Sequence, residues 1–339
     1  MKKILMSLCL YILPWFCFAI SPLPQTTHLL ILIPGSHIDH NYSQAAYEGI
    51  QTIQNKAYQI TWIEQAAKLK KEAIKSIIQH HQARGYRVII AIGDEFSQTV
   101  SELAPTFPKL IFFTTGSQAK GNNVITYCLD RIPQAGVLAG FIAAYSTKTN
   151  TVGFVGGKKL VDENEFIAYK NTIKDINPKI RVISTWTNDW FDTKKAAQAT
   201  TDQINEHADL IVAGANTGSI SAASKMKNVY IIGWMADVSD LNRSVVAGSI
   251  VIDFGKLYLM MLDSLKQKNV TAGTVIVKPS DRIWKFGRFG PMLSKAQKQK
   301  IINAHVHKME HALKLYEKAA IPDRNYSLSP TQENCDAPK

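Results

Sequence analysis

The 339-residue sequence contains only four cysteines, and none of them forms a Cys-x-x-Cys pair. So few cysteines exclude a disulfide-stapled scaffold, and the missing spacing argues against a cysteine zinc site. The sequence also lacks a Gly-x-Gly-x-x-Gly loop, a P-loop and a Gly-x-Ser-x-Gly turn. These absences argue against a dinucleotide site, a nucleotide-hydrolysing site and a serine hydrolase.

Beyond the first residues, the sequence has no apolar run of the about 20 residues that a membrane-spanning helix needs. At the start, Lys2 and Lys3 precede an uncharged apolar run that ends in Cys17-Phe18-Ala19. Small residues at positions −3 and −1 of a cleavage site are typical of a secretory signal peptide. We therefore interpret 1–19 as a cleaved signal peptide, with an uncleaved anchor as the alternative. No lipobox precedes Cys17, so we expect a periplasmic or secreted protein without a lipid anchor.

The composition, 46% hydrophobic and 19% charged residues, is that of a globular protein. The formal net charge is +12, and removal of 1–19 takes away two lysines and leaves +10. The lysines are scattered along the chain, which predicts a solvated basic surface and not a nucleic-acid site. Cys128 and Cys335 remain after cleavage, and both a disulfide bond and two free thiols stay open.

Short apolar runs alternate with longer stretches of helical period, which predicts an α/β protein with parallel sheets. The expected strands of the first half are 28–33, 59–64, 87–92, 109–114 and 123–128, and the helices are 43–57, 68–83, 95–104 and 132–146. The alternation restarts near residue 150. The second half has strands 151–155, 180–186, 209–213, 229–232 and 245–252, and helices 162–175, 193–206, 218–226, 254–267 and 294–318.

The stretch of alternating strands and helices is too long for a single hydrophobic core. We therefore expect two doubly wound lobes joined by a hinge. We assign 27–147 and about 254–282 to the first lobe, and 148–253 and about 283–320 to the second. The hinge segments are expected near 146–150, 252–254 and 281–284. The polar, proline-containing segment 321–339 is expected to be a flexible tail.

Two groups of histidines are candidate metal ligands. His37 and His40 lie at a strand-helix junction, and His307 and His311 are four residues apart on a helix with His305 nearby. No third ligand accompanies either group, so a solvated surface explains them at least as well. We expect no metal and no cofactor.

Polar and aromatic residues follow the predicted strands, at the sheet edge where open α/β proteins bind ligands. Flat rings suit a planar ligand, while carboxylates and amides suit hydroxyl-rich groups. The candidate ligand-binding residues are Ser36, Asp39, Tyr42, Ser43, Gly93, Asp94, Trp190, Asn216, Gly233, Trp234 and Asp237. Core packing remains the alternative for Trp186 and Phe191, whereas Trp190 follows polar residues after its strand has ended.

Several segments resemble the basic membrane protein family of ABC-transporter substrate-binding proteins, from about Leu29 to Phe289. Tyr42 opens a helix that runs to Tyr47-Glu48-Gly49, as in the motif of that family's first lobe. The segments Leu138-Ala-Gly140, 148–157 (KTNTVGFVGG) and 186–192 (WTNDWFD) are similar to further family motifs in the same order. The order and spacing of these motifs make the resemblance specific.

The resemblance implies a type I periplasmic-binding fold and a purine nucleoside, or a related compound, as ligand. It implies that the base stacks between Tyr42 and Trp190, with Gly93, Asp94 and Asn216 lining the walls. A membrane permease would be the partner, and the protein is expected to be a monomer and not an enzyme. Met235 stands where the family commonly has a sugar-binding Asp, which leaves Asp237 alone in that loop.

Alternative functions remain open at this point. One is a periplasmic ligand sensor, or a degenerate homologue that takes no part in transport. Another is an exported α/β hydrolase, which would need a nucleophile with a base or a bound metal, and the sequence offers neither.

Overall fold

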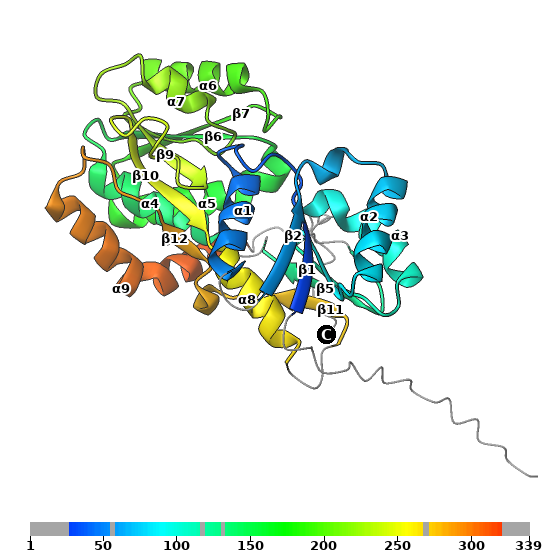
Figure 1. Cartoon of the computed structure of the whole chain (residues 1–339). Coiled ribbons are helices and arrows are strands. Elements are labelled where there is room, and N and C mark those ends of the chain that lie inside the picture. Colours follow the sequence, from blue (N-terminus) through cyan, green and yellow to red (C-terminus); the bar gives the residue numbers. More distant parts are fainter. Residues whose placement is uncertain (1–26, 55–57, 116–118, 130–132, 267–270, 321–339) are drawn as a thin grey trace, which may run out of the picture.

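The computed structural model describes residues 27–54, 58–115, 119–129, 133–266 and 271–320. The predicted signal peptide, 1–19, and the predicted tail, 321–339, lie outside these ranges. The described residues form two lobes, each built on a six-stranded sheet (Figure 1). All but one of the strand pairings are parallel, which confirms the predicted fold class.

The first sheet has the strand order β11-β5-β4-β3-β1-β2 and is entirely parallel. Its strands are β1 (Thr27–Leu32), β2 (Tyr58–Ile63), β3 (Val88–Ala91), β4 (Ile111–Thr114), β5 (Val124–Cys128) and β11 (Gly273–Ile276). The helices of this lobe are α1 (Tyr42–Gln54), α2 (Lys71–Ala83), α3 (Ser97–Leu103) and α8 (Phe254–Ser264). Short 3₁₀ helices lie at Ala66–Lys68, Asp94–Phe96, Ala104–Thr106 and Pro279–Asp281.

Strand β1 is apolar on both sides because helices cover both faces of the sheet. Successive side chains of a strand point to opposite faces. Leu29 and Ile31 accordingly belong to the core on the side of α1 and α8, and Leu30 and Leu32 to the core on the side of α2 and α3. All four side chains are buried. Double coverage therefore explains why this strand appears in the sequence as an unbroken apolar run.

The second sheet has the order β12-β10-β9-β8-β6-β7, in which only β12 runs antiparallel. Its strands are β6 (Thr151–Gly156), β7 (Arg181–Trp186), β8 (Leu210–Val212), β9 (Tyr230–Met235), β10 (Val246–Ile252) and β12 (Trp284–Phe286). The helices of this lobe are α4 (Gln134–Ser146), α5 (Lys159–Ile176), α6 (Thr193–Asn205), α7 (Gly218–Ala223) and α9 (Lys295–Ala320). Figure 1 shows α6 and α7 on one side of this sheet and α4, α5 and α9 on the other.

Helix α4 packs with the second lobe, although the sequence-based division assigned it to the first. It lies against α5, α9 and β10. Gly136 and Gly140 make the close approach to α5 possible, because a Cβ on Gly136 would come within 2.0 Å of the Glu165 carbonyl oxygen. The first crossover between the lobes therefore precedes α4, between β5 and α4, and does not follow it at 146–150.

The second and third crossovers lie side by side. The chain leaves the second lobe at Asp253, between β10 and α8, and returns to it between β11 and β12. The Asp253 backbone N–H donates to the Ile283 carbonyl at 2.6 Å, and the Lys285 ammonium pairs with the Asp253 carboxylate at 2.6 Å. These contacts join the two segments of chain that connect the lobes at this position.

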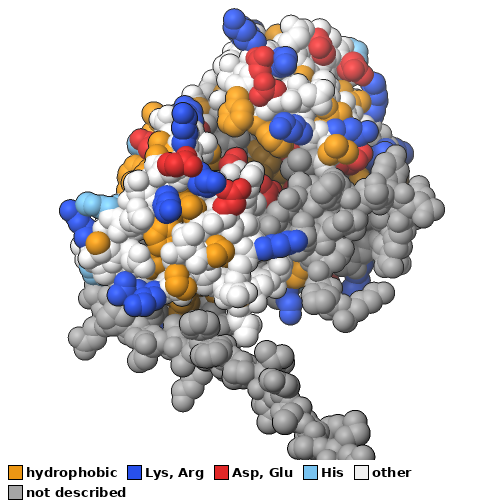
Figure 2. All heavy atoms as spheres, turned by 90° about the vertical axis from the view of Figure 1, so that its right-hand side faces the viewer, with side chains coloured by type: hydrophobic (Ala, Val, Ile, Leu, Met, Phe, Trp, Pro, Cys, Tyr) orange, Lys and Arg blue, Asp and Glu red, His pale blue; other side chains and the backbone are white. Residues whose placement is uncertain are grey.

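Surface charge is mixed on the face drawn in Figure 2, where basic side chains stand among acidic and hydrophobic ones. This mixture agrees with the scattered lysines of the sequence. Among the described residues, no helix is long and apolar enough to cross a membrane. Cys128 is disulfide-bonded, and every other cysteine lies outside the described ranges. Of the two alternatives for this residue, the free thiol is therefore wrong.

Candidate functional site

The first wall is the edge of the first-lobe sheet at which its parallel strands end. The loop between β1 and α1 forms the centre of this wall. Asp39 caps α1: its Oδ1 accepts from the N–H groups of Asn41 (2.8 Å) and Gln44 (3.0 Å), and its Oδ2 from that of Ser43 (3.1 Å). Such bonds satisfy N–H groups that a helix leaves unpaired at its start. The Ser43 hydroxyl accepts from the Gly35 N–H at 3.0 Å and closes the loop. Asp39 and Ser43 thus have partners within the protein.

Tyr42 is held on this wall by its ring and by its hydroxyl. The ring lies edge-on to Phe254, with centroids 5.1 Å apart. The hydroxyl is 3.0 Å from the Thr115 hydroxyl, which also accepts from the Gly93 N–H at 2.8 Å. Gly93 has φ 112°, a conformation that glycine adopts without strain. The structure therefore connects Tyr42, Gly93 and the end of β4 in one hydrogen-bonded group.

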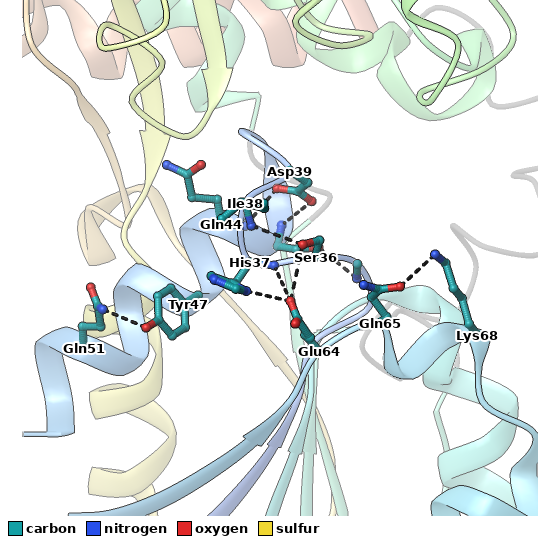
Figure 3. Close-up of polar contacts among 12 residues, drawn as sticks. Ser36, His37, Ile38, Asp39, Gln44, Tyr47, Gln51, Glu64, Gln65 and Lys68 are labelled. Atoms are coloured by element: carbon teal, nitrogen blue, oxygen red, sulfur yellow. Dashed lines mark hydrogen bonds and ion pairs between the residues drawn. The ribbon is translucent and has the colours of Figure 1, made fainter.

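Ser36 belongs to a polar group on the outer side of the loop, drawn in Figure 3. The Glu64 carboxylate lies 2.7 Å from His37 Nδ1, and it accepts from the His37 N–H at 3.0 Å and weakly from the Ser36 hydroxyl at 3.4 Å. The hydrogen bond from His37 lowers the pKa of Glu64. The His37 ring also packs against Tyr47 and Trp62. This arrangement braces the end of β2 against the loop.

Trp190 dominates the second wall, after β7. Its indole N–H donates to Asp162 Oδ2 at 3.1 Å, and the same oxygen accepts from the Gly157 N–H at 2.7 Å. The ring lies against Gly157, where an added Cβ would come within 2.1 Å of it. The Asn216 amide donates to the Trp190 carbonyl at 3.1 Å. Loops after β6, β7 and β8 therefore fix the half-buried ring at one edge of the sheet.

Two charged groups accompany the indole. Burial raises the pKa of Asp162 to about 6, although the bonds from Trp190 and Gly157 favour its charged form. The Lys158 ammonium lies 4.9 Å from the centroid of the Trp190 ring, within the range of a cation–π contact. Burial raises the pKa of Glu95, which follows Asp94 in the first lobe, and the Lys158 charge acts in the opposite direction.

The end of β9 and the loop after it supply further predicted residues. Trp234 is only 6% exposed and packs edge-on against Phe154, so most of its ring belongs to the core. The Ala236 N–H donates to the Trp234 carbonyl, which places Met235, with φ 68°, at the centre of a γ-turn. Asp237 Oδ2 accepts from Arg288 Nε at 2.9 Å and from the Arg288 N–H at 3.0 Å.

Asp237 is held in its charged form by these contacts. Burial alone would raise the pKa of Asp237, but the hydrogen bonds from Arg288 and Ser239 lower it. Arg288 also pairs with Asp240 at 2.6 Å. The carboxylate of Asp237 therefore serves an ion-pair group inside the second lobe.

The two lobes meet around a small space. His40 and Asn41 of the first lobe line one side of a space of about 10 Å³, which is roughly the room that one water molecule needs. Residues of the second lobe line the other side. The second-lobe residues are Ala213, Asn216, Thr217, Ile220, Gly233, Trp234 and Val238. Of the predicted residues, Asn216, Gly233 and Trp234 lie together here. That the Tyr42 and Trp190 rings face each other between the lobes remains a prediction.

The contributors to these walls that were not among the predicted site residues include Thr115, Asp162, His40 and Asn41. Thr115 directly follows a strand, so position alone could have indicated it. Asp162 lies on α5, and only the fold brings it to Trp190. Within the described part of the chain, no group of three or more histidine, cysteine or acidic residues could hold a metal ion.

A family model described as ABC transporter substrate-binding protein PnrA-like matches residues 26–319. The chain is 23% identical over 273 residues to the transcriptional activator protein Med of Bacillus subtilis, covering 80% of this chain and 85% of that protein. It is 23% identical over 270 residues to an ABC transporter nucleoside-binding protein of Lactococcus lactis, covering 70% and 74%.

A solved structure of a transcriptional activator of the comK gene from Bacillus halodurans has the same fold. Its TM-score is 0.71 at 18% identity, and the match covers 84% of this chain and 98% of that one.

Proposed function

Because the chain belongs to the family of PnrA-like ABC transporter substrate-binding proteins, we propose that it is the exported binding component of an ABC importer. It clamps a small planar ligand, a purine nucleoside or a related compound, between its two lobes. A membrane permease then receives the ligand from the closed form. As a member of a substrate-binding family, the protein is not an enzyme.

The observation that carries this proposal is the fixed position of Trp190. Asp162 holds its ring nitrogen, Gly157 lies against its ring and Asn216 holds its carbonyl. A ring fixed before binding loses little conformational entropy when a ligand stacks on it. A stacked base on an aromatic ring contributes about 1–3 kcal/mol. The similarity to a nucleoside-binding relative supports a flat ligand of this kind.

The Trp190→Ala variant tests the proposal. We expect it to weaken binding at least tenfold, because it removes the stacking surface, while the folded structure is retained. Ligands are first found by a thermal-shift screen of nucleosides, bases, flavins and sugars, since a bound ligand raises the melting temperature. The affinity of each hit is then measured by calorimetry.

Phe191→Ala is the matched control, because Phe191 is the neighbouring aromatic residue and is 84% exposed. It should leave the affinity nearly unchanged. An affinity that survives Trp190→Ala would remove Trp190 from the site. A flat thermal response to the whole screen would count against the nucleoside-like ligand.

A second candidate function is ligand sensing. The match to Med, a transcriptional activator, covers most of both chains, and it favours a protein that binds a ligand and reports it to a receptor. Deletion of the gene separates the two functions. Loss of ligand uptake supports the importer, whereas unchanged uptake with altered transcription supports the sensor.

A further inference from the structure

We propose that His40 and Asn41 form a plug: when the lobes come together without a ligand, these two first-lobe residues fill part of the space in which the proposed ligand binds. Ligand binding then competes with closure of the empty protein. The inference rests on the proposed function for its ligand, but the closure itself is measured without one. It follows from the loop that carries the plug, from the second-lobe residues that the plug faces, and from the space left between them.

The loop that carries the plug is fixed within the first lobe. Asp39 Oδ1 accepts from the Asn41 N–H at 2.8 Å, and Asp39 Oδ2 accepts from the Ser43 N–H at 3.1 Å. The Asp39 N–H in turn donates to the Ser36 carbonyl at 3.1 Å. A rotation of one lobe against the other preserves such contacts inside each lobe. The plug therefore moves with the first lobe as a fixed projection.

The backbone of His40 indicates that its side chain matters more than the turn. His40 has φ 55°, in the left-handed region that residues other than glycine adopt uncommonly. Glycine adopts this conformation without a steric penalty, so the turn alone is better served by glycine. Unfavourable backbone conformations of this kind cluster at functional positions. The half-buried imidazole is the feature that glycine does not supply.

The plug faces the part of the second lobe in which predicted ligand residues gather. The loop after β8 brings Asn216 to this place, and the end of β9 brings Gly233 and Trp234. Ile220, Trp234 and Val238 line the same space and are 5%, 6% and 3% exposed. These three side chains belong to the buried clusters of the second lobe. The plug therefore lies over the apolar end of that lobe's core.

The space that remains is too small for the proposed ligand. About 10 Å³ lies between the plug and the second lobe, roughly the room of one water molecule. A fused two-ring base is several times larger than a water molecule. A ligand that stacks on Trp190 and reaches Asn216 or Gly233 therefore requires the plug to withdraw. The plug and the ligand exclude one another at this end of the site.

The contact made by the plug is incomplete, which keeps it reversible. Asn41 Oδ1 is buried without a hydrogen-bond partner among the described residues. The facing Asn216 uses its amide inside the second lobe, where it donates to the Trp190 carbonyl at 3.1 Å and accepts from the Gly218 N–H at 2.9 Å. A buried acceptor without a partner destabilises the contact that buries it. The plug therefore weakens ligand binding without abolishing it.

Competition of this kind has a consequence of definite sign. A protein whose binding-competent form is only partly populated binds its ligand with an affinity reduced by that fraction. Removal of the plug raises the fraction of open molecules and therefore raises the affinity. Removal of a residue that contacts the ligand has the opposite effect.

The His40→Gly variant tests the closure by small-angle X-ray scattering without ligand. Glycine retains the loop conformation, because it adopts a φ of 55° freely, while the side chain is lost. We expect a larger radius of gyration than for wild type, and a further increase when Asn41→Ala is added. The matched control is His207→Gly, which replaces an exposed second-lobe histidine whose φ of 69° is also left-handed. It should leave the radius unchanged. Equal radii for wild type and His40→Gly would overturn the inference.

Calorimetry with a ligand found in the thermal-shift screen gives the second measurement. We expect His40→Gly to bind this ligand at least threefold more tightly than wild type, and His207→Gly to bind it equally well. Unchanged or weaker binding by His40→Gly would contradict the plug and leave the proposed function intact. A screen without any hit would count against the proposed function, and the scattering measurement would still decide the inference.

Discussion

Asp162 is a carboxyl group whose burial is only partly compensated. It accepts two hydrogen bonds on one oxygen, from the Trp190 indole and the Gly157 backbone. Burial nevertheless raises its pKa from 3.8 to about 6. Between these values the folded protein binds more protons than the unfolded chain, so stability falls as the pH rises through this window. Above it, the charged carboxylate destabilises the fold.

Asp162→Asn should therefore stabilise the protein at pH 7.5, by up to about 3 kcal/mol for a shift of roughly two pKa units. The amide oxygen of Asn can accept both hydrogen bonds without carrying a charge. The gain should shrink toward pH 4, where Asp162 is protonated. Urea unfolding of both proteins at pH 4, 6 and 7.5 measures this difference.

Asp162→Ala is the control, because it removes the charge and the acceptor together. It should lose much of the gain, since the Trp190 and Gly157 N–H groups are left without their partner. A stability difference between wild type and Asp162→Asn that does not vary with pH would contradict the assignment.

For single residues, the sequence indicates which of them lie at the strand ends. It does not indicate which of them have hydrogen-bond partners inside the protein. Trp190 and Asn216 were predicted because they follow strands, and Gly233 because it follows the expected strand 229–232, although it lies within β9. Asp39 and Asp237 were found for the same reason, yet a helix start and Arg288 take up their oxygens. Such partners depend on local turns and on residues distant in the chain, which periodicity does not report.

Helix α1 depends at its start on one side chain. Asp39→Ala should destabilise the protein by about 1–2 kcal/mol, because three backbone N–H groups lose their acceptor. Thermal unfolding monitored by circular dichroism measures the change. Asp39→Asn keeps one acceptor oxygen and should retain about half of the contribution that the Asp39 cap makes to stability. An alanine variant as stable as wild type would show that the cap contributes little.

Elements with a continuous apolar run or a helical stripe were predictable, and two edge strands were not. The strands with continuous apolar runs and the helices with a clear stripe occur near their expected positions, because packing on two faces imposes both patterns. Strands β11 and β12 were missed: they have four and three residues, and they lack the continuous apolar run that indicates the equally short strands β3, β4 and β8. The lobe of α4 was also misassigned, since its burial on nearly all sides leaves no polar face to indicate its neighbours.

One apolar cluster extends across both lobes, and each lobe has a second cluster of its own. Residues on the inner side of both sheets, together with α1, α4, α8 and α9, belong to a single cluster of buried side chains. Ile252 and Phe254 belong to this cluster and lie on either side of the crossover at Asp253. A continuous core couples the stability of both lobes.

We therefore expect one cooperative unfolding transition for the whole molecule. Scanning calorimetry should give a single peak whose calorimetric enthalpy equals the van't Hoff enthalpy, with fluorescence and circular dichroism changing together. Two resolved transitions would show that the lobes unfold separately. Trp190→Phe serves as the comparison for the fluorescence signal, because it removes only one of the six tryptophans.

The paired crossovers at Asp253 and Ile283 determine how the walls can separate. Two connecting segments tied by a backbone hydrogen bond and an ion pair resist sliding past each other more than they resist bending together. In the proposed clamp, we therefore expect the movement to be a swing about the line on which they lie. The displacement of a residue then grows with its perpendicular distance from that line, so residues far from the crossovers travel through the longest arc.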